Sequence, residues 1–244
     1  FRKLDFSSLK VTLSGGMALQ LSVPERWKTV TGCEICEGYG MTETSPVVSV
    51  NPIQNIQIGT IGIPMPSTLC KVINDAGEEL PLGEVGELCI KGPQVMKGYW
   101  ERPDATAEIM DSDGWLKSGD IAIIQPDGYM RIVDRKKDMI LVSGFNVYPN
   151  ELEDVMASLS GVLQSAAIGI PDEKTGELIK VFIVVKPGMT LTKDVVMKHM
   201  RANLTAYKAP KFVEFRDSLP TTNVGKILRR ELRDEELKKL GLKK

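Results

Sequence analysis

The hydrophobic pattern of the chain changes twice along its length, and these changes constrain the fold more than any single motif. The first pattern begins with an apolar run at Leu9 that ends in a glycine pair. A helical pattern follows to Thr31, and a second apolar run leads into the sequence CEICEGYGMTE. Strand, helix and strand in this order favour a parallel sheet with a site at the strand ends. Residues 1–56 are therefore predicted to form a βαβ piece of α/β architecture.

Residues 57–133 carry the second pattern, in which short apolar runs alternate with turn signals. Asp113 with Gly114 and Asp127 with Gly128 form dipeptides that favour turns, since glycine accepts a positive φ. Short strands at regular spacing are typical of an antiparallel sheet or a small barrel. We therefore predict a β-rich subdomain for this part of the chain.

The third pattern begins after Lys137, where helical and strand-like segments alternate. Asn150 is placed to cap a helix whose apolar residues recur every three or four positions: Leu152, Val155, Met156 and Leu159. The runs VLQSAAIGI and IKVFIVVK predict strands, residues 192–204 predict a helix, and ILRRELRDEELKKLGLKK predicts a charged amphipathic helix. Residues 137–244 are therefore predicted to form a small α+β domain, with the boundary between residues 136 and 137.

The composition of the chain excludes several classes of function. The net charge is -1 and aromatic residues make up 6%, so the chain lacks the basic footprint of a nucleic-acid-binding protein. His199 is the only histidine, which removes Ser–His and Cys–His nucleophile schemes and leaves Cys33 and Cys36 without the partners of a zinc site. No apolar run approaches the roughly 20 residues that cross a membrane, and no signal peptide is recognisable.

The segment GYGMTETSP offers groups that suit a nucleotide. Gly38 and Gly40 allow a backbone to approach a flat ligand closely, and Tyr39 offers an aromatic face. The hydroxyl of Thr42 suits a phosphate, and the carboxylate of Glu43 suits Mg²⁺. A tight turn with a solvated glutamate is the alternative interpretation of the same residues.

Two further motifs each carry one charged side chain that could contact a ligand. Asp120 follows a glycine turn, so its carboxylate could accept two ribose hydroxyls, although a turn aspartate that bonds its own backbone has the same pattern. Lys226 follows Gly225, so its ammonium could reach a carboxylate and a phosphate that repel each other. A solvated basic loop is the alternative for this lysine.

Taken together, the order and spacing of six motifs are specific. They are SGG at 14–16, YGMTE at 39–43, GWLKSGD at 114–120, DRKKDMILVSGFNVYP at 134–149, YKAPK at 207–211 and NVGKILRREL at 223–232. In this order they resemble the adenylate-forming superfamily, and within it the long-chain fatty-acid–CoA ligase (fatty acyl-CoA synthetase) family of bacteria. The resemblance covers essentially all 244 residues, with Ser118 where threonine is usual, so a hydroxyl is kept.

The resemblance implies a two-step reaction with ATP, Mg²⁺ and coenzyme A. A long-chain fatty acid reacts with ATP to give acyl-AMP and pyrophosphate, and the thiol of coenzyme A then attacks the acyl-AMP. Residues 1–136 would form the C-terminal part of the large AMP-binding domain, and residues 137–244 a small mobile lid with its hinge at Lys137. Ser143 and Gly144 would border the path of coenzyme A. A cytoplasmic location is expected; peripheral contact with the inner face of the cell membrane and a homodimer stay open.

The resemblance also implies roles at the nucleotide. Gly15 and Gly16 would line the pocket for the acyl group and adenine. Tyr39, with Gly38 and Gly40 on either side, would stack on adenine.

The phosphates and the ribose would be bound by charged and hydroxyl groups. Thr42 would bond the α-phosphate and Glu43 would hold Mg²⁺. Asp120 would bond the ribose hydroxyls, and Arg135 would contact the ribose or a phosphate. Lys226 would bridge the fatty carboxylate and the α-phosphate in the first step only, so Thr42, Glu43 and Lys226 are the implied catalytic residues.

One departure from the family pattern affects the expected activity. The family carries a Ser/Thr/Gly-rich phosphate loop, ending in Pro-Lys-Gly, ahead of the SGG motif, and the 244 residues hold no such segment. The resemblance therefore implies the C-terminal portion of the enzyme, which we expect to bind adenylate weakly and not to turn over alone. Two alternatives remain: another adenylate-forming ligase, such as a coumarate-CoA ligase or an adenylation domain, and a non-catalytic nucleotide- or CoA-binding fragment.

Overall fold

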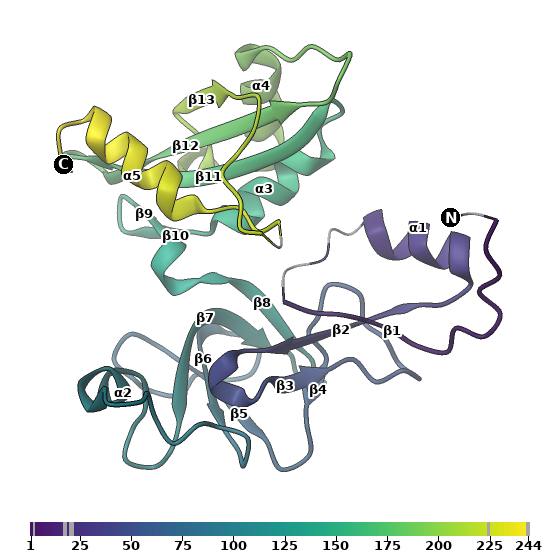
Figure 1. The fold of residues 1–244 in the computed structure, drawn as a ribbon. Helices are drawn as coiled ribbons and strands as arrows, with labels where there is room; N and C mark the ends of the chain where they lie inside the picture. Colours follow the sequence, from purple (N-terminus) through teal and green to yellow (C-terminus); the bar gives the residue numbers. More distant parts are fainter. Residues whose placement is uncertain (2, 17–18, 20–21, 224, 243–244) are drawn as a thin grey trace. The chain divides into compact units, whose positions relative to one another are not determined.

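The computed structural model describes residues 1, 3–16, 19, 22–223 and 225–242. The chain divides into two compact units, Phe1–Val133 and Asp134–Lys244. The predicted boundary, between residues 136 and 137, lies just after this division. Figure 1 labels the helices and strands of both units.

The first sheet of unit 1 contains the predicted βαβ piece. Strand β1 (Thr12–Ser14) pairs in parallel with β2 (Ile35–Gly40), and helix α1 (Ser22–Thr31) lies between them in sequence. The strands β3 (Val47–Val50) and β4 (Ile63–Pro64) extend the sheet in antiparallel fashion, in the order β1-β2-β3-β4. The first strand begins at Thr12 and not at Leu9 because its partner strand begins at Ile35, the residue that pairs with Thr12.

The second sheet of unit 1 is the predicted β-rich subdomain. Its strands, in the order β5-β6-β7-β8, are β5 (Leu69–Ile73), β6 (Val85–Lys91), β7 (Leu116–Ile124) and β8 (Met130–Arg135). The pairs β5/β6 and β6/β7 are antiparallel, and helix α2 (Pro103–Ile109) precedes β7. Leu88, Ile90 and Met130 are fully buried in its core. The strand path of the described residues stays open, so the antiparallel sheet is confirmed and the small barrel is not.

Unit 2 is built on one five-stranded sheet. Its strands are β9 (Ile140–Val142), β10 (Phe145–Val147), β11 (Val162–Asp172), β12 (Gly176–Val185) and β13 (Phe212–Phe215). The order is β10-β9-β12-β11, and β13 pairs in parallel with β12. The long antiparallel pair β11/β12 corresponds to the two strands predicted in this region.

Helices cover both faces of the unit 2 sheet (Figure 1). The helices are α3 (Pro149–Ser158), α4 (Lys193–Asn203) and α5 (Arg229–Lys239). Ala167 packs in one buried cluster with residues of α3 and α4, whereas its neighbour Ala166 packs in another cluster with Leu232 of α5. This alternation follows from the period of two along a strand, which points successive side chains to opposite faces.

The predicted N-cap of the first helix in unit 2 is wrong. Helix α3 begins at Pro149 with Tyr148 at the N-cap, so Asn150 lies inside the first turn. Proline favours this first position because its φ is already helical and it has no N–H to satisfy. The N–H of Asn150 donates instead to Oδ2 of Asp134, at 2.7 Å.

The C-terminal helix is also shorter than its amphipathic pattern. Ile227 forms a bridge with Thr221, so helix α5 starts only at Arg229. The last two residues of the predicted helix, 243–244, lie outside the described residues.

In the described part of the chain, no helix has both the length and the apolar character needed to cross a membrane. The helices α4 and α5, for example, have 11 residues each.

Candidate nucleotide and coenzyme A site

Two of the predicted glycine motifs meet at the C-terminal ends of the parallel strands in unit 1. Gly15 follows β1, and a Cβ atom built on it would lie 3.4 Å from the carbonyl oxygen of Gly38 in β2. Gly16 has a φ of 84°, which favours glycine. The carboxyl ends of parallel strands are where α/β folds place ligands, so this edge carries the candidate site.

The turn after β2 requires glycine at its start. A Cβ atom on Gly40 would lie 1.9 Å from the carbonyl oxygen of Pro46. That oxygen accepts hydrogen bonds from the N–H of Met41, at 2.9 Å, and from the hydroxyl of Thr44, at 2.7 Å. The backbone therefore folds back tightly and forms the short 3-10 helix η1 (Thr42–Thr44), which carries Thr42 exposed and Glu43 half-buried.

Tyr39 and Asp120, 81 residues apart, lie together. The hydroxyl of Tyr39 donates to Oδ2 of Asp120 at 2.5 Å. Asp120 is buried, and its backbone N–H donates to the hydroxyl oxygen of Ser118 at 3.1 Å. That hydroxyl donates in turn to the carbonyl oxygen of Leu88 in β6. The residue that replaces threonine in the family pattern thus keeps a hydrogen-bonding function in the strand that carries Asp120.

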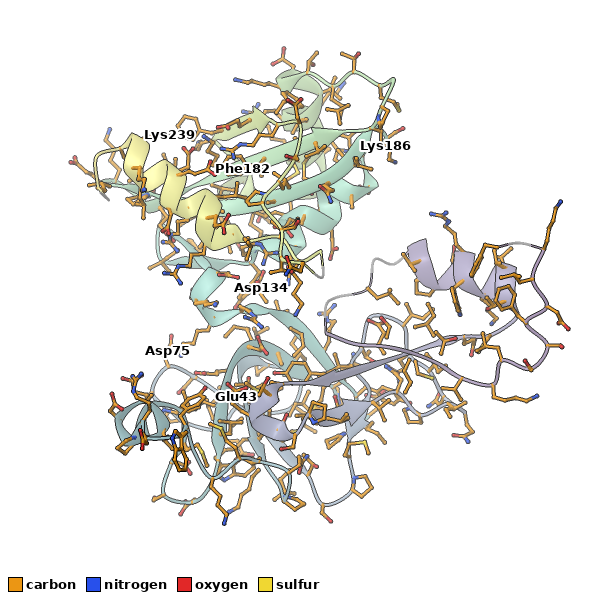
Figure 2. All side chains as sticks on the ribbon, viewed as in Figure 1. Glu43, Asp75, Asp134, Phe182, Lys186 and Lys239 are labelled. Carbon is orange, nitrogen blue, oxygen red and sulfur yellow. The ribbon has the colours of Figure 1, made fainter. Side chains whose placement is uncertain are left out.

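Glu43 is held at two points by the segment ahead of α2, a contact that the sequence analysis missed. The hydroxyl of Tyr99 donates to Oε1 of Glu43 at 2.7 Å, and the N–H of Met96 donates to the Glu43 carbonyl oxygen at 2.8 Å. The hydrogen bond to Glu43 raises the pKa of Tyr99, so the phenol stays protonated and keeps donating. The sequence KGYW around Tyr99 carries no local signal for this contact. Figure 2 labels Glu43 in its turn.

The described residues could hold Mg²⁺ through a single carboxylate, but not through a cluster of acidic side chains. No cluster of three or more His, Cys, Asp or Glu side chains that could hold a metal occurs among them. A single carboxylate such as Glu43 fits a Mg²⁺ ion that takes its remaining ligands from phosphates and water, which is how Mg²⁺ accompanies nucleotides.

In unit 2, the predicted nucleotide and hinge residues lie in consecutive short elements. Arg135 is the last residue of β8, and its N–H donates to Oδ1 of Asp134 at 2.7 Å. Lys137 lies in the short 3-10 helix η2 (Lys136–Asp138) and is exposed.

Ser143 and Gly144 form the tip of the β9/β10 hairpin. Phe145 pairs with Val142, so the loop has two residues, and both have a positive φ, 51° for Ser143 and 83° for Gly144. Two positive φ values in a two-residue hairpin are the reason for glycine here. A Cβ atom on Gly144 would meet nothing within 4 Å, so the tip is open. The ring of Phe145 stacks on Tyr207, with ring centroids 4.8 Å apart.

Lys226 lies in a closed loop immediately ahead of α5. The N–H of Thr222 donates to the Lys226 carbonyl oxygen at 2.8 Å, and the Lys226 N–H donates to the Thr222 hydroxyl at 3.1 Å. Gly225 has a φ of 84° and allows the turn between them. The lysine is therefore held at its backbone on a tight turn.

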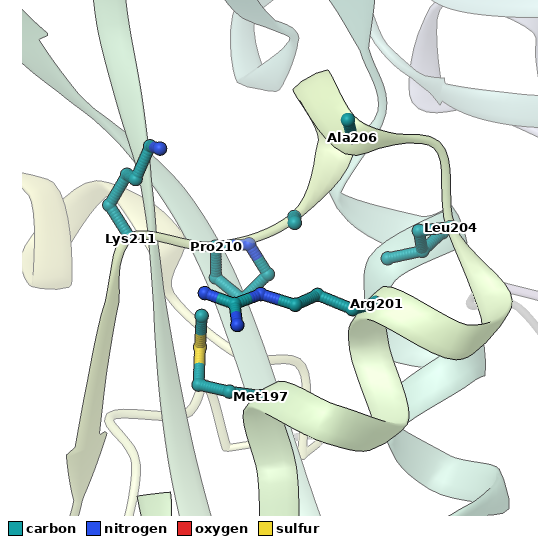
Figure 3. A pocket seen from close by; sticks show the side chains of 7 residues that line it. Met197, Arg201, Leu204, Ala206, Pro210 and Lys211 are labelled. Atoms are coloured by element: carbon teal, nitrogen blue, oxygen red, sulfur yellow. The ribbon is translucent and has the colours of Figure 1, made fainter. Parts of the chain in front are cut away.

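A shallow hollow in unit 2 contains none of the predicted site residues. Its lining residues come from α4 and from the segment after it: Met197, Arg201, Leu204, Ala206, Ala209, Pro210 and Lys211. Figure 3 shows Met197 and Arg201 facing Pro210.

Comparison with known proteins decides the family. The model of AMP-binding enzymes matches residues 1–100, and the model of the AMP-binding enzyme C-terminal domain matches residues 151–226. The chain belongs to the AMP-binding enzyme family. The resemblance found in the sequence, and with it the α/β and α+β fold of an adenylate-forming enzyme, is confirmed.

Curated relatives and solved structures of AMP-binding enzymes match almost the whole chain. The long-chain-fatty-acid–CoA ligase of Salmonella typhimurium is 58% identical over 236 residues, which are 96% of this chain and 42% of that protein. The feruloyl-CoA synthase of an Amycolatopsis species is 43% identical and covers 96% of this chain and 48% of that protein. ATP-bound MatB from Rhodopseudomonas palustris matches with a TM-score of 0.89 and 35% identity, over 94% of this chain and 46% of that chain. The chain thus spans less than half the length of these relatives.

Proposed function

We propose that this chain supplies nucleotide, magnesium and coenzyme A contacts of a ligase that converts a long-chain fatty acid into acyl-AMP and then into acyl-CoA. The observation that carries the proposal is the hydrogen bond between Tyr39 and Asp120. A phenol ring beside a carboxylate suits the adenine and the ribose hydroxyls of one nucleotide. The identity of 58% to the Salmonella ligase supports a long-chain fatty acid as the substrate.

In the first step, an oxygen of the fatty carboxylate attacks the α-phosphorus of ATP, and the bond to pyrophosphate breaks. The hydroxyl of Thr42 donates to the α-phosphate, and Lys226 offsets the repulsion between that phosphate and the fatty carboxylate. Glu43 would hold Mg²⁺, which neutralises phosphate charge when bound. The exposed Thr42 hydroxyl and the half-buried Glu43 carboxylate on one short turn support this division of roles.

In the second step, the sulfur of coenzyme A, having lost its proton to solvent, attacks the acyl carbon, and the bond between that carbon and the phosphate oxygen of AMP breaks. The open tip at Ser143 and Gly144 would border the pantetheine arm, because a larger residue than glycine would project into that space. Lys137 would be the hinge that changes backbone conformation between the steps, and Arg135 would bind the nucleotide. These roles rest on the family motif and on the exposure of both cations.

Lys226→Ala tests the division between the two steps. The assay uses a chimera in which these 244 residues replace the matching segment of the Salmonella ligase. We expect acyl-AMP formation, measured by pyrophosphate exchange, to fall by about 10²–10³, the scale of losing one electrostatic contact to the transition state. Thioester formation from supplied acyl-AMP should persist. An equal loss in both steps contradicts the role of Lys226.

The substrate alternative is an aromatic acid, because the feruloyl-CoA synthase is also a relative. The same chimera, offered a long-chain fatty acid and ferulate side by side, should activate the fatty acid. The non-catalytic alternative is tested by turnover. The chimera should form acyl-CoA from ATP, a long-chain fatty acid and coenzyme A, whereas a folded chimera that binds AMP without forming acyl-CoA would support a fragment that only binds nucleotide or coenzyme A. The cytoplasmic location, the peripheral membrane contact and the homodimer stay predictions.

A further inference from the structure

Two adjacent arginines at the start of α5 have opposite environments. The side chain of Arg230 is 88% exposed, whereas that of Arg229 is 17% exposed. Arg230 has one distant ion-pair contact, 4.0 Å to Asp234 on the next helical turn. An arginine is rarely buried without paired charges, so Arg229 requires acidic partners close to its guanidinium group.

All three nitrogen atoms of the Arg229 guanidinium group lie close to acidic or amide oxygen atoms. Its Nε and Nη2 atoms donate to the two carboxylate oxygens of Glu153, at 2.9 and 2.6 Å. Nη2 also donates to the side-chain oxygen of Asn150 at 2.6 Å. Nη1 lies 3.5 Å from Asp138 and 3.8 Å from Asp134. Such a fork requires the planar guanidinium, which lysine does not reproduce.

The partners of Arg229 lie on both sides of Lys137 in the sequence. Asp134, in β8, precedes it; Asp138, in η2, and Glu153, in α3, follow it. The Asp134 side chain is fully buried, and its two oxygens accept hydrogen bonds from the N–H groups of Arg135 and Asn150, both at 2.7 Å. Figure 2 labels Asp134 in this segment. A change of backbone angles at Lys137 therefore has to break or strain the contacts of Asp134.

Arg229 is also joined directly to the loop of Lys226. Only Ile227 and Leu228 separate the two residues, and both are fixed at their backbones. Ile227 forms a bridge with Thr221, and the N–H of Leu228 donates to the carbonyl oxygen of Pro220 at 2.8 Å. Because this short connection is held on both sides, the position of Arg229 determines the position of the base of the Lys226 loop.

We propose that Arg229 is a positioning residue of the adenylation step: it fastens the Lys226 loop to segment 134–138, and Asp134 holds that segment in one conformation. The proposal rests on the proposed function, in which Lys226 acts in the first step and Lys137 is the hinge. Arg229 touches neither nucleotide nor fatty acid in this role. It acts through Lys226, and the Asp134 contacts oppose movement at the hinge.

The experiment compares Arg229→Lys and Asp134→Asn with Arg230→Lys as the matched control. In the chimera, the first two variants should slow pyrophosphate exchange about tenfold, as expected when a catalytic group is misplaced without being removed. Thioester formation from supplied acyl-AMP should stay within about twofold, since Lys226 is not needed there. Arg230→Lys should change neither step. Equal loss of both steps in Arg229→Lys would overturn the proposal, because a merely structural residue has that effect.

Hydrogen exchange on the 244-residue chain tests the fastening without any activity. Arg229→Lys should speed amide exchange in peptides that contain Arg135, Asn150 and Lys226, and leave strand β12 unchanged. If the amide exchange rate of the peptide that contains Lys226 did not change in Arg229→Lys, the proposal would be overturned, whatever the activity of the variant. If the unsubstituted chimera lacks both half-reactions, the proposed function fails, while the exchange result still decides whether Arg229 fastens the loop.

Discussion

At the scale of single residues, Tyr99 is the contact that most affects the candidate metal ligand. Its hydroxyl donates to Glu43 at 2.7 Å and orients the carboxylate. We expect Tyr99→Phe to leave Glu43 present but less well oriented, so the KM for Mg·ATP in the adenylation step should rise. The expected rise is about fivefold to tenfold, which corresponds to the roughly 1 kcal/mol that one intramolecular hydrogen bond typically contributes.

The matched control for Tyr99→Phe is Tyr129→Phe. The hydroxyl of Tyr129 also donates a hydrogen bond in unit 1, to the carbonyl oxygen of Asn55 at 2.5 Å, but it contacts no candidate site residue through that bond. A steady-state titration of Mg·ATP should leave the KM of this control unchanged. Equal KM values for both variants would show that Tyr99 does not orient the metal ligand.

At the scale of elements, two substitutions at the tip of the β9/β10 hairpin distinguish the effect of backbone strain from the effect of side-chain size at the proposed coenzyme A site. Gly144 has a φ of 83°, so any L-residue there is strained by about 1–2 kcal/mol. Gly144→Ala and Gly144→Leu carry the same strain, but only leucine fills the open space above the tip. We expect Gly144→Leu to slow thioester formation from acyl-AMP more than Gly144→Ala does. Equal rates for the two variants, measured in single turnovers, would contradict a role in the coenzyme A path.

The elements also show what a sequence can and cannot predict. Strands β11 and β12 were predictable because their apolar runs are long and bounded by turns, and α4 because its apolar residues repeat at helical spacing. The N-cap of α3 was not predictable, because the Asn150 N–H donates to Asp134, which is 16 residues away in the sequence. The Tyr39–Asp120 pair and the contacts of Tyr99 and Arg229 depend on pairing between distant segments, which leaves no local pattern.

At the scale of the whole molecule, the stability of the chain should depend on pH through a charge network of unit 2. Glu214 in β13 lies 2.6 Å from Lys180 and 2.8 Å from Arg216. Burial acts to raise its pKa, but the hydrogen bonds from Lys180 and Arg216 outweigh burial and lower it from 4.5 to about 2. A carboxyl with a lowered pKa in the folded state stabilises the fold above its unfolded pKa and loses this contribution as the pH falls.

The pH window follows from these two pKa values. The contribution of Glu214 should be complete above about pH 5 and lost progressively toward pH 2. Thermal melts of the 244-residue chain between pH 7 and pH 2.5 should therefore fall less steeply for Glu214→Gln than for the unsubstituted chain. Glu84→Gln, at an exposed position, is the control and should follow the unsubstituted chain. Parallel curves for Glu214→Gln and the unsubstituted chain would mean that the ion pairs of Glu214 with Lys180 and Arg216 contribute little to folding.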